Sequence, residues 1–482
     1  MNQKFLSNLA FLLAANLLVK PFYIFGIDRT VQVTVGTEMY GVYFALYNFS
    51  ILFYIILDLG LTNYNNRTIA QNRDLLKSYL PNLIVVKLGL SFVFLGLLFL
   101  VAIMLGYDVL KLKLLLPLAL NQILISFIFY FRSNITAYHY FKMDALISIL
   151  DRLILIVVCS VLLWGSVVST FKIEYFIYAQ TFAYAITALM AFLVVLRFVD
   201  FTHLNLNQLV QKTKLVQILK ESFPYALLIL LMTLYNRIDG IMLERLLDDD
   251  GNEAGIYAAA YRLLDAVNVF GLLFASLLLP LFAKMLKDKV PIQNLTQTSF
   301  QTILAFSITV AIGCFIFQQE IMSLLYPEAT VYWAEVFSWL MFSFIAISSV
   351  YIFGTLMTAN ANLRALNWIA ISGVVLNVIL NFILIPNYKA YGATIATVNT
   401  QALVAIAHII WAIRLFNLKF SIGFVLRILG YGFLISIGGY FTYSLNLNWI
   451  IRFIAFNGLA LIGTFSFKLI DIQLFVNAIR NR

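Results

Sequence analysis

Charged side chains inside long apolar stretches are the residues of this sequence best placed to do chemistry. A charge within a membrane costs free energy, so it usually faces the protein interior or a water-filled cavity and marks a substrate or ion pathway. Cations there would attract an anionic group, and carboxylates could couple to an ion. The candidates are Lys20, Arg29, Arg237 and Arg262 for substrate binding, and Asp28, Asp239 and Asp265 for ion coupling.

Lys20 precedes Pro21 inside the first apolar run, which begins at Phe5. A proline inside a helix breaks it and frees carbonyl groups, which is tolerated where helices line a cavity. We expect Lys20 to be a cation of such a cavity; the alternative is a side chain that reaches from a shorter helix to the membrane surface. Asp28 and Arg29 are expected to end this helix, either as site residues or as an ordinary terminus at the interface.

The seventh and eighth apolar runs, each expected to be a membrane-spanning helix, carry charges at matching depths. A helix rises 1.5 Å per residue, which puts Arg237 about 15 Å and Asp265 about 14 Å from the outer ends of their helices. Asp239 lies about 12 Å deep and Arg262 about 9 Å deep by the same measure. The predicted pairs are Arg237 with Asp265 and Asp239 with Arg262. They would either only dock the helices or form a switch in which protonation of the aspartate frees the arginine.

Other charged residues in the apolar runs are expected to have structural roles. Most lie near a helix end, where a long side chain reaches the polar interface at little cost. Asp58, near the inner end of the second run, is instead expected to order the turn before Arg67. The residues assigned to this structural group are Asp58, Lys87, Asp151, Arg152, Glu244, Arg245, Arg427 and Arg452.

The composition of this 482-residue chain is that of a membrane protein, because 62% of its residues are hydrophobic and 11% are charged. Soluble domains carry about 25% charged residues. The net charge of +10 does not indicate a nucleic-acid partner, because no stripe of basic residues with interleaved aromatics appears in a polar context. The basic residues are instead expected in cytoplasmic loops, where they fix the membrane topology.

Cysteine and histidine are too few and too scattered for metal or thiol chemistry. Cys159 and Cys314 both lie in apolar runs, and His139, His203 and His408 are far apart in the sequence. The sequence also lacks the glycine-rich phosphate-binding loop of nucleotide-hydrolysing proteins. We therefore expect no catalytic residue, no metal and no cofactor, and no ATP hydrolysis by this chain.

Apolar runs of about 20 residues predict helices that cross the membrane. They lack the alternation of polar and apolar residues that is typical of a transmembrane β-barrel. The predicted fold class is an all-α polytopic membrane protein with about 14 transmembrane helices. The spans are expected at 5–27, 40–62, 80–106, 114–131, 145–168, 174–196, 223–247, 256–283, 298–318, 331–359, 365–386, 391–413, 421–441 and 447–467.

The distribution of Lys and Arg predicts how these helices are oriented. With the N-terminus in the cytoplasm, most basic residues outside the spans fall in cytoplasmic segments and few fall in outer loops, as the positive-inside rule requires. One missed or extra helix would scramble this alternation. Both termini are therefore expected in the cytoplasm, and the acidic loop 248–253 on the outer side.

A short internal repeat suggests that the chain contains two six-helix halves. A Gly-x-Glu motif followed by Gly-x-Tyr occurs at 36–43 and again, one residue shorter, at 251–257. These are the outer starts of the second and eighth spans, and six helices per half make the repeat parallel. The predicted organisation is a first lobe at 1–200, a cytoplasmic linker at 201–222, a second lobe at 223–416 and two additional helices at 417–482.

Several stretches resemble the signatures of a known transporter family. In the first half they are Gly36-x-Glu38-x-x-Gly41-x-Tyr43, Asp58-Leu59-Gly60-Leu61-Thr62 and Asn66-Arg67-Thr68-Ile69-Ala70; in the second half they are Asn377-x-x-Leu380-Asn381-x-x-Leu384-Ile385-Pro386 and Gly392-Ala393-Thr394-x-Ala396-Thr397. On these residues the chain is identified as a member of the Wzx-type O-antigen and polysaccharide flippases, in the multidrug/oligosaccharidyl-lipid/polysaccharide (MOP) exporter superfamily. The resemblance covers essentially the whole chain.

This resemblance implies a V-shaped pair of lobes that alternates between inward-open and outward-open states. The implied substrate is a polyprenyl diphosphate that carries an oligosaccharide, such as an O-antigen unit of lipopolysaccharide. The diphosphate is anionic, so the cations named above would be its ligands. The resemblance also implies a location in the bacterial inner membrane, transport driven by an ion gradient, and membrane lipid and other polysaccharide assembly proteins as partners.

Two rival functions are also considered. A multidrug exporter of the MATE branch of the same superfamily would carry a dedicated set of carboxylates for the coupling cation, but the signatures favour the polysaccharide branch. A membrane glycosyltransferase, O-antigen polymerase or ligase would present a large outer loop with acidic or arginine-rich catalytic residues. All outer loops expected here are short, including the acidic loop at 248–253, so we expect a transporter and not an enzyme.

Overall fold

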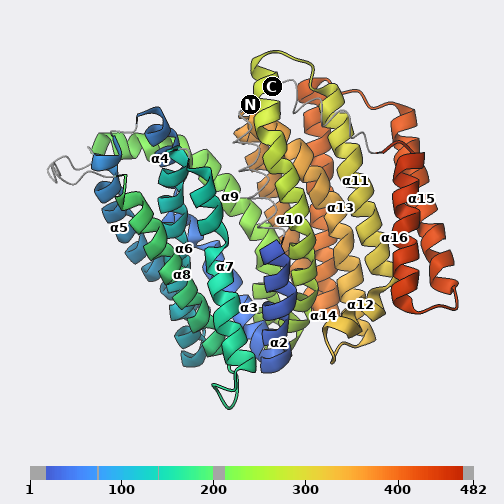
Figure 1. Cartoon of the computed structure of the whole chain (residues 1–482), viewed down its shortest axis with the longest axis horizontal. Helices are drawn as coiled ribbons and strands as arrows, with labels where there is room; N and C mark the ends of the chain where they lie inside the picture. Colours follow the sequence, from blue (N-terminus) through green and yellow to red (C-terminus); the bar gives the residue numbers. More distant parts are fainter. Residues whose placement is uncertain (1–17, 73–74, 139, 199–211, 470–482) are drawn as a thin grey trace. The chain divides into compact units, whose positions relative to one another are not determined.

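The structure is a computed structural model that describes residues 18–72, 75–138, 140–198 and 212–469. Within these ranges all regular secondary structure is helical, and eleven helices are long and apolar enough to cross a membrane (Figure 1). One of them, α14 (Leu363–Phe416), contains two of the expected spans, because Lys389 near its middle has a non-helical backbone (φ 54°, ψ −133°). The first two expected spans are helices interrupted within their length. The predicted all-α polytopic membrane fold is confirmed.

The chain divides into two compact units. Unit 1 comprises the residues up to Glu244 and the segment Asp248–Gly255, and unit 2 comprises Arg245–Leu247 and the residues from Ile256 onward. The helix α9 (Lys212–Leu246), which contains the seventh span, therefore belongs to unit 1 for most of its length. Much of the predicted linker lies outside the described residues, and the predicted lobe boundaries remain a prediction.

Unit 1 is built around α6, which packs against α3 (Thr37–Leu52), α4 (Leu61–Gln71), α7 and α8. The helices α5 to α8 are drawn from blue to green in Figure 1. Small and amide side chains of α6, among them Asn121, Ser126 and Asn134, are buried, and such residues let membrane helices approach closely and form hydrogen bonds across their interfaces. Besides α9 and the two interrupted spans, the helices of unit 1 are α5 (Leu76–Met104), α6 (Val109–Ala137), α7 (Phe141–Trp164) and α8 (Ile173–Leu196).

The first helix runs farther than the sequence predicts. It continues past Pro21 through a π-helix, Tyr23–Asp28, into α2, Arg29–Val35. The expectations that the proline breaks the helix and that the Asp-Arg pair at 28–29 ends it are therefore wrong. The helix ends at Gly36, whose φ of 87° is open to glycine because it has no Cβ. The irregularity begins two residues after the proline, in π-helical turns of a kind that is frequent at functional sites.

Unit 2 is organised around α13, which packs against α11, α12 and α14. The last two helices, α15 and α16, form a hairpin that packs against α11 (red in Figure 1). Besides α14, the helices are α10 (Asn252–Lys287), whose first residues belong to unit 1, α11 (Gln293–Ile316), α12 (Gln318–Leu325), α13 (Val331–Ala359), α15 (Ile422–Ser444) and α16 (Trp449–Ser466).

Hydrogen bonds fix the α15–α16 hairpin to α11. At the start of the hairpin, Gln293 donates from Nε2 to the carbonyl of Lys419 (2.6 Å) and accepts from its amide (3.0 Å). Farther along, the hydroxyl of Tyr431 lies 2.5 Å from Oγ1 of Thr309. A polar contact inside an apolar interface favours one register of two helices, because a shifted register would lose the hydrogen bond between them. The hairpin is therefore an integral part of unit 2.

Candidate functional site

Arg152 is held against two tyrosine rings near the middle of α7, inside unit 1. Its guanidinium carbon lies 4.7 Å from the centre of the Tyr23 ring and 5.9 Å from that of Tyr184. Such cation–π contacts hold the guanidinium in place, and the Tyr184 hydroxyl also acts on it through a side-chain hydrogen bond. The neighbouring carboxylate of Asp151 is 3.7 Å from Nε, which is too long for a hydrogen bond. Arg152 is thus a positioned cation that is only loosely neutralised.

Lys20 belongs to the same group of charges. Its side chain is half-buried, and the charged groups that act on its ammonium are Arg152, Asp151 and Arg132. Lys20 and Tyr23 are three residues apart on one helix and so lie on the same face, which brings Lys20 toward the guanidinium stacked on Tyr23. Two cations near one carboxylate leave an excess of positive charge. We call Lys20, Tyr23, Asp151, Arg152 and Tyr184 the cation cluster.

Asp28 lies farther along the first helix, in a network of hydroxyl and amide groups. Its side chain is buried, and Oδ1 accepts a hydrogen bond of 2.9 Å from the hydroxyl of Tyr40. The Tyr40 ring is 5.5 Å from that of Tyr43, whose hydroxyl accepts a hydrogen bond from Gln180 on α8 (2.8 Å). The network joins the first helix to α3 and α8. Asp28 is therefore anchored to α3 and, through Tyr40 and Tyr43, to α8, and its role in ion coupling stays a prediction.

The other predicted site residues are distributed over both units. Arg29, next to Asp28, is half-buried. In α9, within unit 1, Arg237 is half-buried and Asp239 is fully buried. In unit 2, Arg262 and Asp265 lie one helical turn apart on α10, with the guanidinium 3.7 Å from the carboxylate.

The contact between Arg262 and Asp265 is made within one helix, whereas the predicted pairs would join α9 to α10. Each predicted pair has one member in unit 1 and one in unit 2. The pairs Arg237–Asp265 and Asp239–Arg262 therefore stay predictions.

The second span is interrupted by a short segment that is not α-helical. α3 (Thr37–Leu52) is followed by a 3-10 helix, Tyr54–Leu57, and α4 (Leu61–Gln71) begins after a turn. In that turn Leu59 and Gly60 have φ angles of 44° and 84°, in the left-handed region that favours glycine. The interruption exposes backbone carbonyls inside the helix bundle, and these need other partners.

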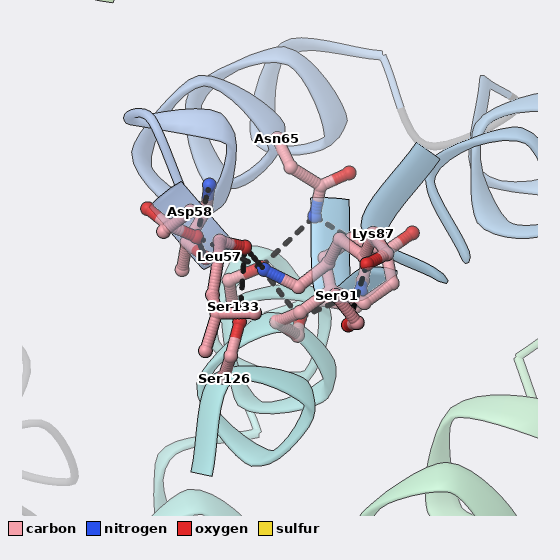
Figure 2. Close-up of polar contacts among 10 residues, drawn as sticks. Leu57, Asp58, Asn65, Lys87, Ser91, Ser126 and Ser133 are labelled. Atoms are coloured by element: carbon pink, nitrogen blue, oxygen red, sulfur yellow. Dashed lines mark hydrogen bonds and ion pairs between the residues drawn. The ribbon is translucent and has the colours of Figure 1, made fainter. Parts of the chain in front are cut away.

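A buried ion pair supplies those partners, as Figure 2 shows. Lys87 on α5 places Nζ 2.9 Å from the carbonyl of Leu57 and 3.2 Å from Oδ1 of Asp58, and the hydroxyl of Ser126 on α6 donates to the same carbonyl (3.1 Å). Asp58 also accepts from the amide and the hydroxyl of Thr62. The expectation that Asp58 orders this turn is confirmed.

Two residues set aside as interfacial are in fact buried. The side chain of Lys87 is 1% exposed, so the expectation that it extends to the interface is wrong: its ammonium neutralises Asp58. Glu244 was expected to be solvated, but its side chain is 2% exposed and pairs with Lys111 at 2.5 Å. In both cases a cation on a neighbouring helix compensates the cost of burial, and such neighbours are not visible in the local sequence.

The cation cluster can bind a phosphate-like anion, because it combines a point charge, Lys20, with a planar donor, Arg152. The sequence analysis missed Arg152 because it placed the start of the fifth span at residue 145, whereas α7 begins at Phe141. That shift moves Arg152 from the interface to the middle of the helix. The mostly apolar segments on both sides of the Asp-Arg pair, Ile147–Leu150 and Leu153–Val158, indicate that this pair lies inside the helix and not at its end.

Groups of three or more His, Cys, Asp or Glu side chains that could hold a metal ion do not occur in the described ranges. Neither of the two cysteines forms a disulfide; Cys159 is buried and Cys314 is half-buried.

Comparisons with known proteins give one family match and several structural matches. A family profile described as "Polysaccharide biosynthesis protein" matches residues 5–286. A solved structure described as "Lipid II flippase MurJ, inward closed conformation" matches with a TM-score of 0.72 and 15% sequence identity, over 94% of this chain and 98% of that one. Comparison with curated protein sequences gives no match.

Two further solved structures have the same fold. An inward-facing multidrug resistance MATE family transporter of the MOP superfamily matches with a TM-score of 0.64 and 16% identity, over 82% of this chain and 94% of that one. A MOP superfamily transporter from Pyrococcus furiosus matches with a TM-score of 0.61 and 15% identity, over 85% and 95% of the two chains. At such identities the similarity establishes the fold.

Proposed function

This chain belongs to the polysaccharide biosynthesis protein family, and from that premise we propose that it is a flippase for polyprenyl-diphosphate-linked oligosaccharides. It is a multi-pass membrane protein with the fold of MOP superfamily transporters. The observation that supports the substrate is the cation cluster of unit 1, in which Arg152 is fixed by Tyr23 and Tyr184 beside Lys20. We infer that this cluster binds the diphosphate.

A polyprenyl-diphosphate-linked oligosaccharide needs a polar path through the membrane, and the cation cluster would contribute to such a path. An oligosaccharide with a diphosphate cannot cross hydrocarbon without a polar path, because unsatisfied polar groups and charges are costly there. A cation pair inside a helix bundle lowers that cost for the diphosphate. The protein then performs translocation by alternating access and breaks no covalent bond.

We place the protein in the bacterial inner membrane with both termini in the cytoplasm. The O-antigen unit of lipopolysaccharide, or the repeat unit of another surface polysaccharide, is the proposed cargo, and other polysaccharide assembly proteins are the proposed partners. We propose that an ion gradient drives transport, with Asp28, Asp239 and Asp265 as coupling residues. Arg29, Arg237 and Arg262 are further proposed ligands of the anionic substrate.

A MATE-like multidrug exporter is the second candidate, because the fold of a MATE transporter matches with a TM-score of 0.64. The two functions differ in the charge of the cargo. A site for cationic drugs would present carboxylates, whereas the cation cluster presents Lys20 and Arg152. Loss of the gene should therefore abolish a surface polysaccharide under the first function and raise drug sensitivity under the second.

The decisive experiment is deletion of the gene followed by analysis of polyprenyl-linked sugars on both leaflets of the inner membrane. We expect the lipid-linked sugar to accumulate on the cytoplasmic leaflet and the surface polysaccharide to disappear. Complementation with Lys20→Ala should fail although the protein reaches the membrane, and Lys20→Arg should retain more function because a cation remains. An unchanged leaflet distribution in the deletion strain would overturn the proposal.

A further inference from the structure

A small cavity lies between the first turns of α6 and α8, two helices of unit 1 that pack against each other. Its volume is about 180 Å³, and besides apolar side chains it is lined by Lys113 and Pro117 of α6 and by Glu174 and Tyr178 of α8. The ring of Tyr178 belongs to a side chain that is 57% exposed, so the cavity opens at the surface of the unit. It combines one cation and one carboxylate with apolar walls.

Lys113 and Glu174 lie at nearly the same level along their helices. The hydroxyl of Thr181 on α8 donates to the side-chain carbonyl of Asn121 on α6 (2.7 Å), which gives one point of equal height. Lys113 stands eight residues before Asn121, and Glu174 stands seven residues before Thr181. At 1.5 Å per residue the two charges are therefore about 12 Å and about 10 Å from that point.

These two charges do not neutralise each other directly. Within the ranges that the structure describes, neither Lys113 nor Glu174 forms an ion pair with N···O of 4.0 Å or less. Lys111, two residues earlier on α6, is by contrast paired with Glu244. The cavity thus holds a positive and a negative group that are both open to a ligand between them.

Pro117 adds a hydrogen-bond acceptor beside the cavity. Proline has no N–H, so the carbonyl of Lys113, four residues before it, lacks the donor that a helix normally supplies. A backbone carbonyl at membrane depth needs another partner. The carbonyl and the carboxylate of Glu174 are two acceptors suited to a single group with several N–H donors.

The helix surface inward of the cavity is apolar and exposed. Residues three and four apart on a helix share a face, so Leu116 and Leu120 follow Lys113 along α6. In the same way Phe182 follows Tyr178 along α8. These three apolar side chains are 57%, 44% and 53% exposed. The cavity therefore stands at the head of a surface that hydrocarbon chains can cover.

We propose that this cavity binds the headgroup of a zwitterionic phospholipid with a primary amine, such as phosphatidylethanolamine. Lys113 pairs with the phosphate, and Glu174 and the freed carbonyl accept hydrogen bonds from the ammonium. The acyl chains lie along the apolar surface inward of the cavity. A phospholipid in the membrane leaflet at this end of the helices then bridges α6 and α8.

Other lipids match the charges of the cavity less well. A trimethylammonium group has no N–H to donate and is best held by a cage of aromatic rings, whereas the cavity offers one ring, Tyr178. An anionic headgroup without an ammonium would place its phosphate against Glu174, and like charges repel. The same repulsion acts on a diphosphate, so this inference does not depend on the proposed cargo.

The binding of single phospholipids to the delipidated full-length protein tests the proposal. Titration with phosphatidylethanolamine, phosphatidylcholine or phosphatidylglycerol, followed by native mass spectrometry, gives an apparent Kd for each lipid. We expect phosphatidylethanolamine to bind about tenfold more tightly than either of the other two, an effect that corresponds to one charge-assisted hydrogen bond. Equal Kd values, or tighter binding of another of these lipids, would overturn the proposal.

Substitutions in the cavity separate this site from the rest of the lipid-facing surface. Glu174→Gln should weaken the binding of phosphatidylethanolamine about tenfold. Lys172→Gln, at an exposed position two residues earlier, is the matched control and should leave that binding unchanged. Equal weakening by both substitutions would refute a site at this cavity.

A charge reversal guards against misfolding, because it predicts a gain of binding. Glu174→Lys should bind phosphatidylglycerol more tightly than phosphatidylethanolamine, since two cations then face the phosphate and the ammonium has lost its carboxylate. A variant that binds phosphatidylglycerol in this way is folded. Failure of Glu174→Lys to reverse the lipid preference would overturn the proposal.

Discussion

Arg152 and Lys20 illustrate how a single residue acquires a role from its surroundings. Both are basic and both lie in apolar helices, but they are fixed in different ways. The guanidinium carbon of Arg152 lies over the Tyr23 ring, 4.7 Å from its centre, whereas Lys20 is a compact charge on a flexible stem. A planar donor and a mobile point charge together can follow a diphosphate whose orientation changes during transport.

The arginine at 152 should be harder to replace than the lysine at 20. Arg152→Lys keeps the charge but loses the contact with the tyrosine rings and the planar donors. We therefore expect Arg152→Lys to reduce polysaccharide export nearly as much as Arg152→Gln does. The measurement is export in a deletion strain at matched protein levels. Arg427→Gln, on the last helical hairpin, is the control and should export normally. Full export by Arg152→Lys would show that only the charge is needed.

At the scale of elements, the interruption of the second span depends on its ion pair. Lys87→Met leaves Asp58, whose side chain is 17% exposed, without its cation. Loss of one partner of a fully buried pair costs about 3–5 kcal/mol, which is the upper limit for this partly buried pair. We expect a large drop in the melting temperature of the purified protein. Lys87→Met/Asp58→Asn should regain much of the loss, because the asparagine is neutral and can still accept from the amide of Thr62. Equal melting temperatures of the single and the double variant would show that Lys87 does not stabilise the protein by neutralising Asp58.

The α15–α16 hairpin offers a test of how it packs against α11. A Cβ on Gly439 would overlap the tip of Ile316 and lie 3.0 Å from a ring carbon of Phe456, whereas a Cβ on Gly432, on the same helix, would meet nothing within 4 Å. Overpacking of this kind costs about 1–3 kcal/mol. Gly439→Val should therefore lower the melting temperature and Gly432→Val should not, and similar shifts for both would mean that the hairpin is not packed as described.

At the scale of the whole molecule, the orientation in the membrane is the property that charge distribution predicts. We expect residues 248–253 on the periplasmic side and residues 205–215 on the cytoplasmic side. In a cysteine-free background, Asp250→Cys should react with an impermeant reagent in intact spheroplasts, and Asn207→Cys only after the membrane is permeabilised. Labelling of both positions from the same side would refute the predicted topology.

Properties that repeat along the chain can be predicted from the order of its residues. Long apolar runs predicted an all-helical membrane fold, because a helix satisfies its own backbone hydrogen bonds in hydrocarbon. Motifs such as Asp58-Leu59-Gly60 and Asn377 to Pro386 predicted the family, and the family profile that matches residues 5–286 confirms it.

Which charges have partners depends on how the helices pack, because each partner is contributed by another helix. From the local sequence, Lys87 and Glu244 are expected at the interface. In the structure Lys87 pairs with Asp58 and Glu244 pairs with Lys111. Arg152 is likewise expected at the interface. In the structure α7 begins at Phe141, four residues before the expected start, and two tyrosine rings lie against Arg152. Burial and charge pairing depend on distances between residues that are far apart in the sequence, so they follow only from how the helices pack.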